Sequence, residues 1–282
     1  MNKLTATLKL LRPLNLITGA VAVYFTSLIV SPDIDVLLIV ITTGVVVCYN
    51  AGANAYNDFV DYKIDKINQP NRPLSLGVIS RDGAFYISVI LFLIGSIISF
   101  QLNFEAKLIS LGIALPLMIL YSGFLKGQPL VGNIAVSLIL GLTFIFSGAA
   151  FGHIKLMIVP SILAFGLTFI RELVKDIADI EGDKSAGLRT YPIVAGLSKS
   201  VHLVTLSSGL VGLGAFIPYF VDIYGIFYGI LLIFGVEIPL GVVVVTLQNN
   251  PGKTSAIRGA KLLKFSTIVG LLAIYLGSIY DI

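Results

Sequence analysis

Residues 36–66 read VLLIVITTGVVVCYNAGANAYNDFVDYKIDK, an apolar run of membrane-spanning length that ends in a row of polar side chains. The row consists of Asn54, Asp58, Asp61 and Asp65, spaced by 4, 3 and 4 residues. At roughly 100° per residue, an α-helix brings such a set into an arc of about 60°, so the four side chains line one face. The stretch therefore predicts a transmembrane helix with an oxygen-rich face at one end.

The same pattern occurs again 118 residues later, in the stretch RELVKDIADIEGDK at 171–184. Its members are Glu172, Asp176, Asp179 and Asp183, again spaced by 4, 3 and 4 residues. Like charges at these spacings destabilise a helix by roughly 0.2–0.5 kcal/mol per pair even in water, and a divalent cation would relieve the repulsion. A solvated, salt-bridged helix end is the alternative interpretation. The matched spacing, and the apolar run before each row, favour a pair of metal sites.

The composition places the chain among integral membrane proteins. Its 282 residues are 56% hydrophobic and 12% charged, with a mean hydropathy of +0.97, and several apolar runs approach or exceed the ~20 residues that span a bilayer. The first run lacks a convincing cleavage site, so we interpret it as a helix and not a signal peptide. The single cysteine, Cys48, excludes a disulfide framework. We predict one all-α domain, 1–282, with nine spans at 13–31, 36–58, 84–100, 108–124, 129–151, 156–176, 201–221, 223–247 and 260–280.

The distribution of basic residues predicts the orientation of these spans. If the N-terminus is cytoplasmic, all but two of the 19 basic residues lie on the inner side, and only Lys107 and Lys155 lie outside. This asymmetry accounts for the pI near 9.0 without a nucleic-acid partner. It predicts a multi-pass protein of the cell membrane with an outer C-terminus, and both acidic rows at cytoplasmic ends of parallel spans.

Two rows of carboxylates at one membrane face are typical of a site for metal-bound diphosphate. Mg2+ prefers oxygen ligands and is commonly held by one or two carboxylates together with phosphate oxygens. As a Lewis acid it stabilises the charge that builds up on a departing diphosphate. We expect a cytoplasm-facing cavity between the second and sixth spans, with Asp58, Asp61, Asp176 and Asp179 as catalytic residues. The predicted metal ligands are Asn54, Asp58, Asp61 and Asp65 for one ion, and Asp176, Asp179 and Asp183 for another.

Basic and polar side chains near the rows are candidates for binding phosphate oxygens. Arginine offers a two-pronged donor and lysine a point charge. For Lys63, Arg72 and Lys175, an anchor at lipid headgroups is an equal alternative. Glu237, a carboxyl inside the eighth span, is either functional or a packing residue. The predicted substrate-binding residues are Arg12, Asn15, Asn57, Lys63, Arg72, Tyr121, Lys126, Arg171 and Lys175.

The two rows also resemble known motifs. Asn57-Asp58-x-x-Asp61-x-x-x-Asp65, with the Asn-Arg-Pro element ending at Pro73, resembles the first motif of the UbiA superfamily of membrane prenyltransferases, and 176–183 resembles the second. The nine spans match that family over essentially the whole chain. Within it, 57–73 and 171–183 are similar to archaeal digeranylgeranylglyceryl phosphate synthases. The resemblance implies Mg2+-dependent transfer of a geranylgeranyl group from its diphosphate to the sn-2 hydroxyl of geranylgeranylglyceryl phosphate, in ether-lipid synthesis.

Two other functions are alternatives. Members that act on hydroxybenzoate typically carry an arginine where this chain has Tyr62, and a tyrosine-rich stretch where it has Arg171 and Glu172. These departures count against an aromatic, quinone-precursor acceptor. A divalent-cation transporter would need carboxylates deeper in the membrane, and only Glu237 fits that requirement. The acceptor thus depends on resemblance, whereas the metal–diphosphate hypothesis depends on the residues themselves.

Overall fold

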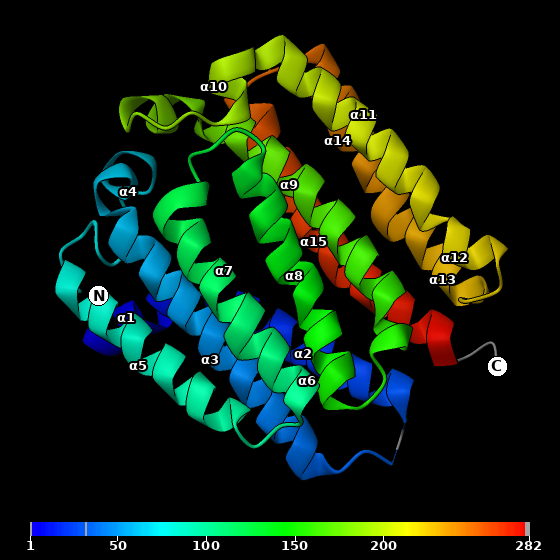
Figure 1. Ribbon diagram of the computed structural model, residues 1–282. Helices are drawn as coiled ribbons and strands as arrows, with labels where there is room; N and C mark the ends of the chain where they lie inside the picture. Colours follow the sequence, from blue (N-terminus) through cyan, green and yellow to red (C-terminus); the bar gives the residue numbers. More distant parts are fainter. Residues whose placement is uncertain (1, 32, 280–282) are drawn as a thin grey trace. The chain divides into compact units, whose positions relative to one another are not determined.

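The computed structural model describes residues 2–31 and 33–279, and every regular element in this part of the chain is helical (Figure 1). Within the described residues, nine stretches are long and apolar enough to cross a membrane, and each predicted span overlaps one of them. The prediction of an all-α, multi-pass membrane protein is therefore confirmed.

Five of the nine stretches are single helices. These are α2 (Pro13–Val30), α3 (Val36–Val60), α5 (Arg81–Ser99), α8 (Val131–Ala150) and α15 (Lys253–Ile279).

The other four stretches combine shorter elements. They are α6 (Phe104–Lys107) with η1 (Leu108–Ala114), α7 (Leu115–Leu120) and η2 (Tyr121–Leu125); η3 (Ile154–Met157) with α9 (Ile158–Ser185); α11 (Leu197–Ala215) with α12 (Ile217–Phe220); and α13 (Ile226–Leu232) with η4 (Ile233–Glu237) and α14 (Ile238–Asn249). Three short helices complete the described fold: α1 (Lys3–Leu11), α4 (Tyr62–Asn68) and α10 (Tyr191–Ala195).

Proline accounts for two of the irregular stretches. The π-helical segments η1 and η4 each end two residues before a proline, Pro116 in α7 and Pro239 in α14. Proline has no N–H to donate to the carbonyl four residues earlier, so the regular α-helical hydrogen-bond pattern is interrupted at these points.

The chain forms two compact units, each with its own packing. The first contains Met1–Lys126 and Leu142–Met157, and the second contains Gly127–Gly141 and Ile158–Ile282. The first acidic row belongs to the first unit and the second row to the second unit. A single domain that includes both stays a prediction.

In the first unit, α3 packs closely along α5 (Figure 1). A Cβ on Gly52 of α3 would lie 2.8 Å from the Phe92 ring, and a Cβ on Gly95 of α5 would lie 2.7 Å from the Tyr49 ring. The Tyr49 hydroxyl also shares a hydrogen bond with Ser96 at 3.0 Å. Small residues allow membrane helices to approach in this way, and the contact fixes the helix that carries the first row.

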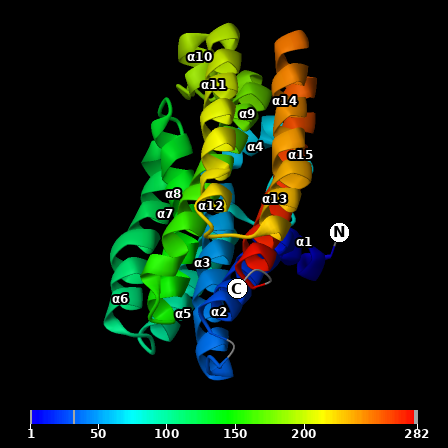
Figure 2. The same cartoon turned by 90° about the vertical axis from the view of Figure 1, so that its right-hand side faces the viewer.

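In the second unit, α9 packs against both α11 and α15, while α14 and α15 lie side by side (Figure 2). A Cβ on Gly259 of α15 would lie 3.1 Å from Val243 in α14 and 3.4 Å from Val174 in α9. On the α11 side, a Cβ on Gly166 of α9 would lie only 3.0 Å from the side chain of Val211. These close contacts hold the helix that carries the second row.

Candidate active site

The first acidic row lies on the buried face of α3 and α4. Asn54, Asp58, Asp61 and Asp65 are only 7%, 2%, 4% and 6% exposed, so the face that they share is buried. Asp61 joins the two helices, yet the backbone N–H of Asp61 still donates to Asn57 and that of Asp65 to Asp61, both at 2.8 Å. The row therefore keeps its helical register across the junction. Charges buried this deeply must be paired.

Arg12 reaches the row from the joint between α1 and α2. Its backbone is left-handed (φ 56°, ψ 69°), and Pro13 begins α2 directly after it. The guanidinium donates to Asp58 Oδ1 at 2.6 Å and to Asn54 Oδ1 at 3.3 Å. Asn54 Nδ2 in turn donates to the carbonyl of Leu11 at 2.9 Å. Arg12 thus lies at the first row, and its predicted role in binding substrate stays a prediction.

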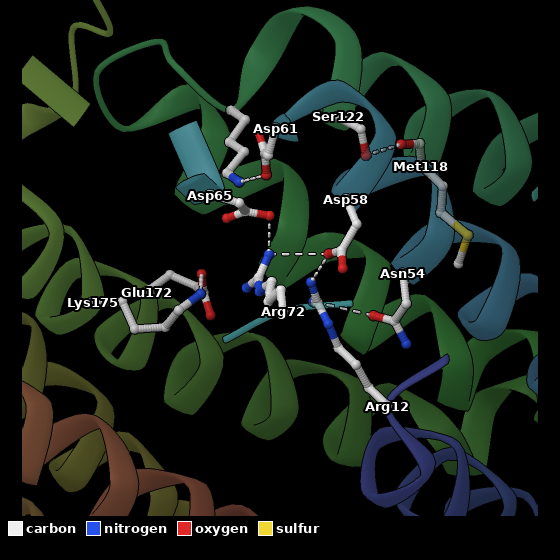
Figure 3. Close-up of polar contacts among 11 residues, drawn as sticks. Arg12, Asn54, Asp58, Asp61, Asp65, Arg72, Met118, Ser122, Glu172 and Lys175 are labelled. Atoms are coloured by element: carbon white, nitrogen blue, oxygen red, sulfur yellow. Dashed lines mark hydrogen bonds and ion pairs between the residues drawn. The ribbon is translucent and has the colours of Figure 1, made fainter. Parts of the chain in front are cut away.

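Two further basic side chains complete the ion pairs of the first row, and Figure 3 labels one of them, Arg72. Arg72 Nη1 donates to Asp58 Oδ1 at 3.0 Å and also to Asp65 Oδ2, so this guanidinium bridges two carboxylates. Lys126 pairs with Asp61. Three carboxylates are thus balanced by three cations within the first unit, counting Arg12.

An apolar cluster holds the segment that carries Arg72. Leu74 and Ile79 follow Arg72 in the connection from α4 to α5 and are 2% and 9% exposed. The turns around them close through backbone hydrogen bonds from Leu76 to Arg72 and from Gly77 to Leu74, both at 3.0 Å. The connection is therefore anchored by its own core, which also includes Ala6, Leu10, Ala55 and Ala84.

The charges in the first unit shift one another's protonation. Burial raises the pKa of the Asp65 carboxyl to about 6; Arg72 opposes this shift, while Asp58 and Asp61 add to it. Burial acts to lower the pKa of the Lys126 ammonium, but the carboxylates of Asp61 and Asp65 more than compensate, so its pKa lies above the ordinary value. Lys126 therefore stays charged at neutral pH, whereas the Asp65 carboxyl takes up a proton as the pH falls through about 6.

The second row has its own partners in the second unit. Glu172 accepts hydrogen bonds from Arg171 Nη1 at 2.7 Å and from Lys175 Nζ at 2.6 Å, the latter drawn in Figure 3. Asp176 accepts one from the amide of Asn133, in α8, at 2.9 Å. Sequence reasoning missed Asn133, although an amide side chain at the start of an apolar span is a signal that the sequence offers. Arg171 and Lys175 both pair with this row, and their predicted role in binding substrate stays a prediction.

Four other predicted substrate-binding residues are placed by the structure in different surroundings. Asn57 Oδ1 is buried and has no hydrogen-bond partner among the described residues. Lys63 is exposed and forms no ion pair with any part of the chain that the structure describes. Asn15 and Tyr121 are half-buried in α2 and η2. The roles of these four residues stay predictions.

The rows offer the kind of ligand that Mg2+ prefers, because both consist of carboxylate and amide oxygens. In residues 2–31 and 33–279, no three acidic, histidine or cysteine side chains surround a common point. In the first row the carboxylates of Asp58, Asp61 and Asp65 face basic side chains instead. The first row therefore fits a divalent cation in two respects: its side chains are of the right ligand type, and they share one helical face.

Comparisons with known proteins agree on one family. The model of the UbiA prenyltransferase family matches residues 15–275. The digeranylgeranylglyceryl phosphate synthase of Pyrococcus horikoshii is 36% identical over 275 residues, covering 97% of both chains. That of Methanosphaera stadtmanae is 32% identical over 272 residues, covering 96% of this chain and 98% of the relative.

Solved structures share the fold. One, from work on digeranylgeranylglyceryl phosphate synthase in membranes, has a TM-score of 0.78 and 32% identity, covering 99% of both chains. A UbiA homolog from Archaeoglobus fulgidus, bound to GPP and Mg2+, has a TM-score of 0.72 and 18% identity, covering 95% of this chain and 99% of that one.

Proposed function

The chain belongs to the UbiA prenyltransferase family, and from this premise we propose that it uses Mg2+ to transfer a geranylgeranyl group from geranylgeranyl diphosphate to the sn-2 hydroxyl of geranylgeranylglyceryl phosphate. Relatives that match nearly the whole chain carry the name of the enzyme for that product. The observation that carries the proposal is the buried first row, where oxygen ligands suited to a metal lie directly beside cations suited to phosphate.

We assign the acidic residues to the metal and the basic residues to the phosphates. When bound, Mg2+ would supply Lewis-acid stabilisation of the charge on the diphosphate. The repetition of the row in the sequence supports a second metal site of the same kind on the other row. The proposed metal ligands are Asn54, Asp58, Asp61 and Asp65 in one row and Asp176, Asp179 and Asp183 in the other; the proposed phosphate contacts are Arg12, Arg72, Lys126, Arg171 and Lys175.

In the proposed reaction, cleavage of the carbon–oxygen bond of the prenyl diphosphate runs ahead of attack by the acceptor hydroxyl. Cations such as Arg72 favour this order, because they bind the charge that develops on the departing group. The hydroxyl must lose its proton as the new ether bond forms. We assign that proton to the departing diphosphate, whose oxygens become more basic once the bond to carbon has broken.

We further propose that both rows face the cytoplasm. The inner excess of basic residues supports this orientation. The short helix α1 carries Lys3 and Lys9 together with the exposed apolar side chains of Leu4 and Leu8. Such a mixture suits a helix that lies in the membrane surface.

The test is a transfer assay with labelled geranylgeranyl diphosphate, the lipid phosphate acceptor and Mg2+. We expect product from the purified chain, and a loss of turnover of about 100-fold or more for Asp58→Asn and for Asp176→Asn. Glu181→Gln is the matched control, because this carboxylate lies on α9 between Asp179 and Asp183 but is 79% exposed and pairs with Lys253. Near-full turnover of either aspartate variant would refute the assignment.

The same assay separates the acceptors. A hydroxybenzoate offered in competition with geranylgeranylglyceryl phosphate should remain unprenylated. If the aromatic compound is prenylated instead, the chain is a prenyltransferase with a different acceptor, and the metal–diphosphate assignment still stands.

A further inference from the structure

The ion pairs of the first row engage the same carboxylates that a metal would need. Asp58 Oδ1 accepts from both Arg12, at 2.6 Å, and Arg72, at 3.0 Å. Arg72 also pairs with Asp65, and Lys126 pairs with Asp61. Every carboxylate of the first row is thus engaged by at least one cation.

A divalent cation on these carboxylates would compete with the basic side chains. It would lie within a few ångströms of two guanidinium groups and an ammonium group, and like charges at such separations repel strongly where water is scarce. Mg2+ also requires a nearly octahedral shell of oxygens. A carboxylate oxygen that already accepts two hydrogen bonds, as Asp58 Oδ1 does, is poorly placed to join that shell.

The structure also shows which partners in these ion pairs are the more exposed. The side chains of Arg12, Arg72 and Lys126 are 30%, 28% and 36% exposed, whereas those of Asp58 and Asp61 are only 2% and 5% exposed. The carboxylates are short and fixed to helices. The cations are long side chains that lie on the more open side of the ion pairs, so a rearrangement would move the cations.

We propose that Arg12, Arg72 and Lys126 are exchangeable counter-ions that make metal loading depend on the diphosphate. They neutralise Asp58, Asp61 and Asp65, and they transfer to phosphate oxygens when metal and diphosphate enter together. Metal alone binds weakly, because it displaces cations that have no other anion to bind. Diphosphate supplies that anion, so each ligand strengthens the binding of the other. This inference rests on the proposed function, since it takes the diphosphate as the second ligand.

The experiment measures Mg2+ binding to the full-length protein by calorimetric titration, with and without inorganic pyrophosphate, which carries no prenyl group to transfer. Arg72→Gln removes the counter-ion that bridges Asp58 and Asp65. We expect it to bind Mg2+ alone about tenfold more tightly than the parent protein, and to bind pyrophosphate at saturating Mg2+ about tenfold more weakly. Lys126→Gln should shift both affinities in the same two directions.

Two further variants separate charge exchange from a structural role. Lys66→Gln removes a neighbouring charge that sits over the Tyr62 ring, 4.5 Å from its centroid, and not on a carboxylate; it should change neither affinity. Arg72→Lys keeps the charge and should return the Mg2+-only affinity towards that of the parent protein. Thermal unfolding identifies any variant that does not fold. If Arg72→Gln does not fold, the two affinities of Lys126→Gln, which lies on a different segment, test the proposal.

The outcomes are distinguishable. Opposite shifts in the two affinities support exchange. If the parent protein binds pyrophosphate with Mg2+ but neither variant binds Mg2+ alone more tightly, the cations stay on the carboxylates and the inference is wrong. If the parent protein binds no pyrophosphate in the presence of Mg2+, the proposed function itself is wrong.

Discussion

Asp65 shows that an ion pair does not by itself keep a carboxylate acidic. Arg72 lowers the pKa of this group, but burial outweighs that effect, and Asp58 and Asp61 act in the same direction as burial. The resulting value of about 6 lies well above the ordinary 3.8. A divalent cation would reverse the balance, because it adds two positive charges at short range. Ligand binding and the protonation of Asp65 are therefore coupled.

This shift predicts a pH-dependent stability effect for Asp65→Asn. Because the folded-state pKa exceeds the unfolded value, the folded chain binds the proton more tightly, and stability falls as pH rises from about 4 to about 6. Asparagine does not ionise, so the stability of the variant should not fall over this pH range. We expect it to be about 1–2 kcal/mol more stable above pH 7, after allowance for solvent screening. The gain should shrink as pH falls towards 4.

Thermal unfolding in detergent across this pH range measures the effect. The exposed Asp33 provides the control, because Asp33→Asn removes a carboxylate that is not buried. A stabilisation by Asp65→Asn that is equal at pH 8 and pH 4 would show that the cause is not the ionisation of the carboxyl.

At the scale of elements, the first row depends on how closely α3 packs along α5. The contact needs glycine at two positions, because the rings of Phe92 and Tyr49 occupy the space in which Cβ atoms of Gly52 and Gly95 would lie. In lipid, helices associate mainly through such packing. A change at this contact would therefore act on the row at a distance, through the position of α3.

We expect Gly95→Ala to destabilise the protein by about 1–3 kcal/mol, because its Cβ would meet the buried Tyr49 ring. Its turnover should also fall. Gly214→Ala in α11 is the matched control, since a Cβ there meets nothing within 4 Å and alanine favours the helix by up to about 1 kcal/mol. Thermal unfolding and the transfer assay measure both effects. Equal behaviour of the two variants would mean that the contact with α5 does not constrain α3.

At the scale of the whole molecule, the proposed orientation can be tested by labelling. In a Cys48→Ser background, His153→Cys and Asn250→Cys each place one thiol at an exposed position between two spans. The positive-inside distribution predicts that a membrane-impermeant maleimide labels position 153 on intact cells. Position 250 should react only after the membrane is opened. The reverse pattern would place both acidic rows on the outer side.

How far the sequence predicted this protein depends on whether a feature is local. The nine spans were predictable because their signal is a run of apolar residues, and the structure has a membrane-length helix at each one. The shared face of the first row was predictable for a similar reason, since helical periodicity decides which side chains lie on one face, whereas its burial was not. The junction at Asp61, where α3 gives way to α4, was not predicted, because the periodicity runs through it unchanged.

Sequence alone thus determined the class of protein, the helices and the oxygen-rich faces, all of which follow from patterns within about 30 consecutive residues. Only the tertiary structure decided which cation serves which carboxylate. Arg12 and Asp58 are 46 residues apart, Lys126 and Asp61 are 65 apart, and Asn133 and Asp176 are 43 apart. Such pairs depend on how α1, α3, α8 and α9 pack within their units, and no local spacing encodes that packing. Arg12, Arg72 and Lys126, which the sequence presented as phosphate contacts, form ion pairs with the acidic row in the folded chain.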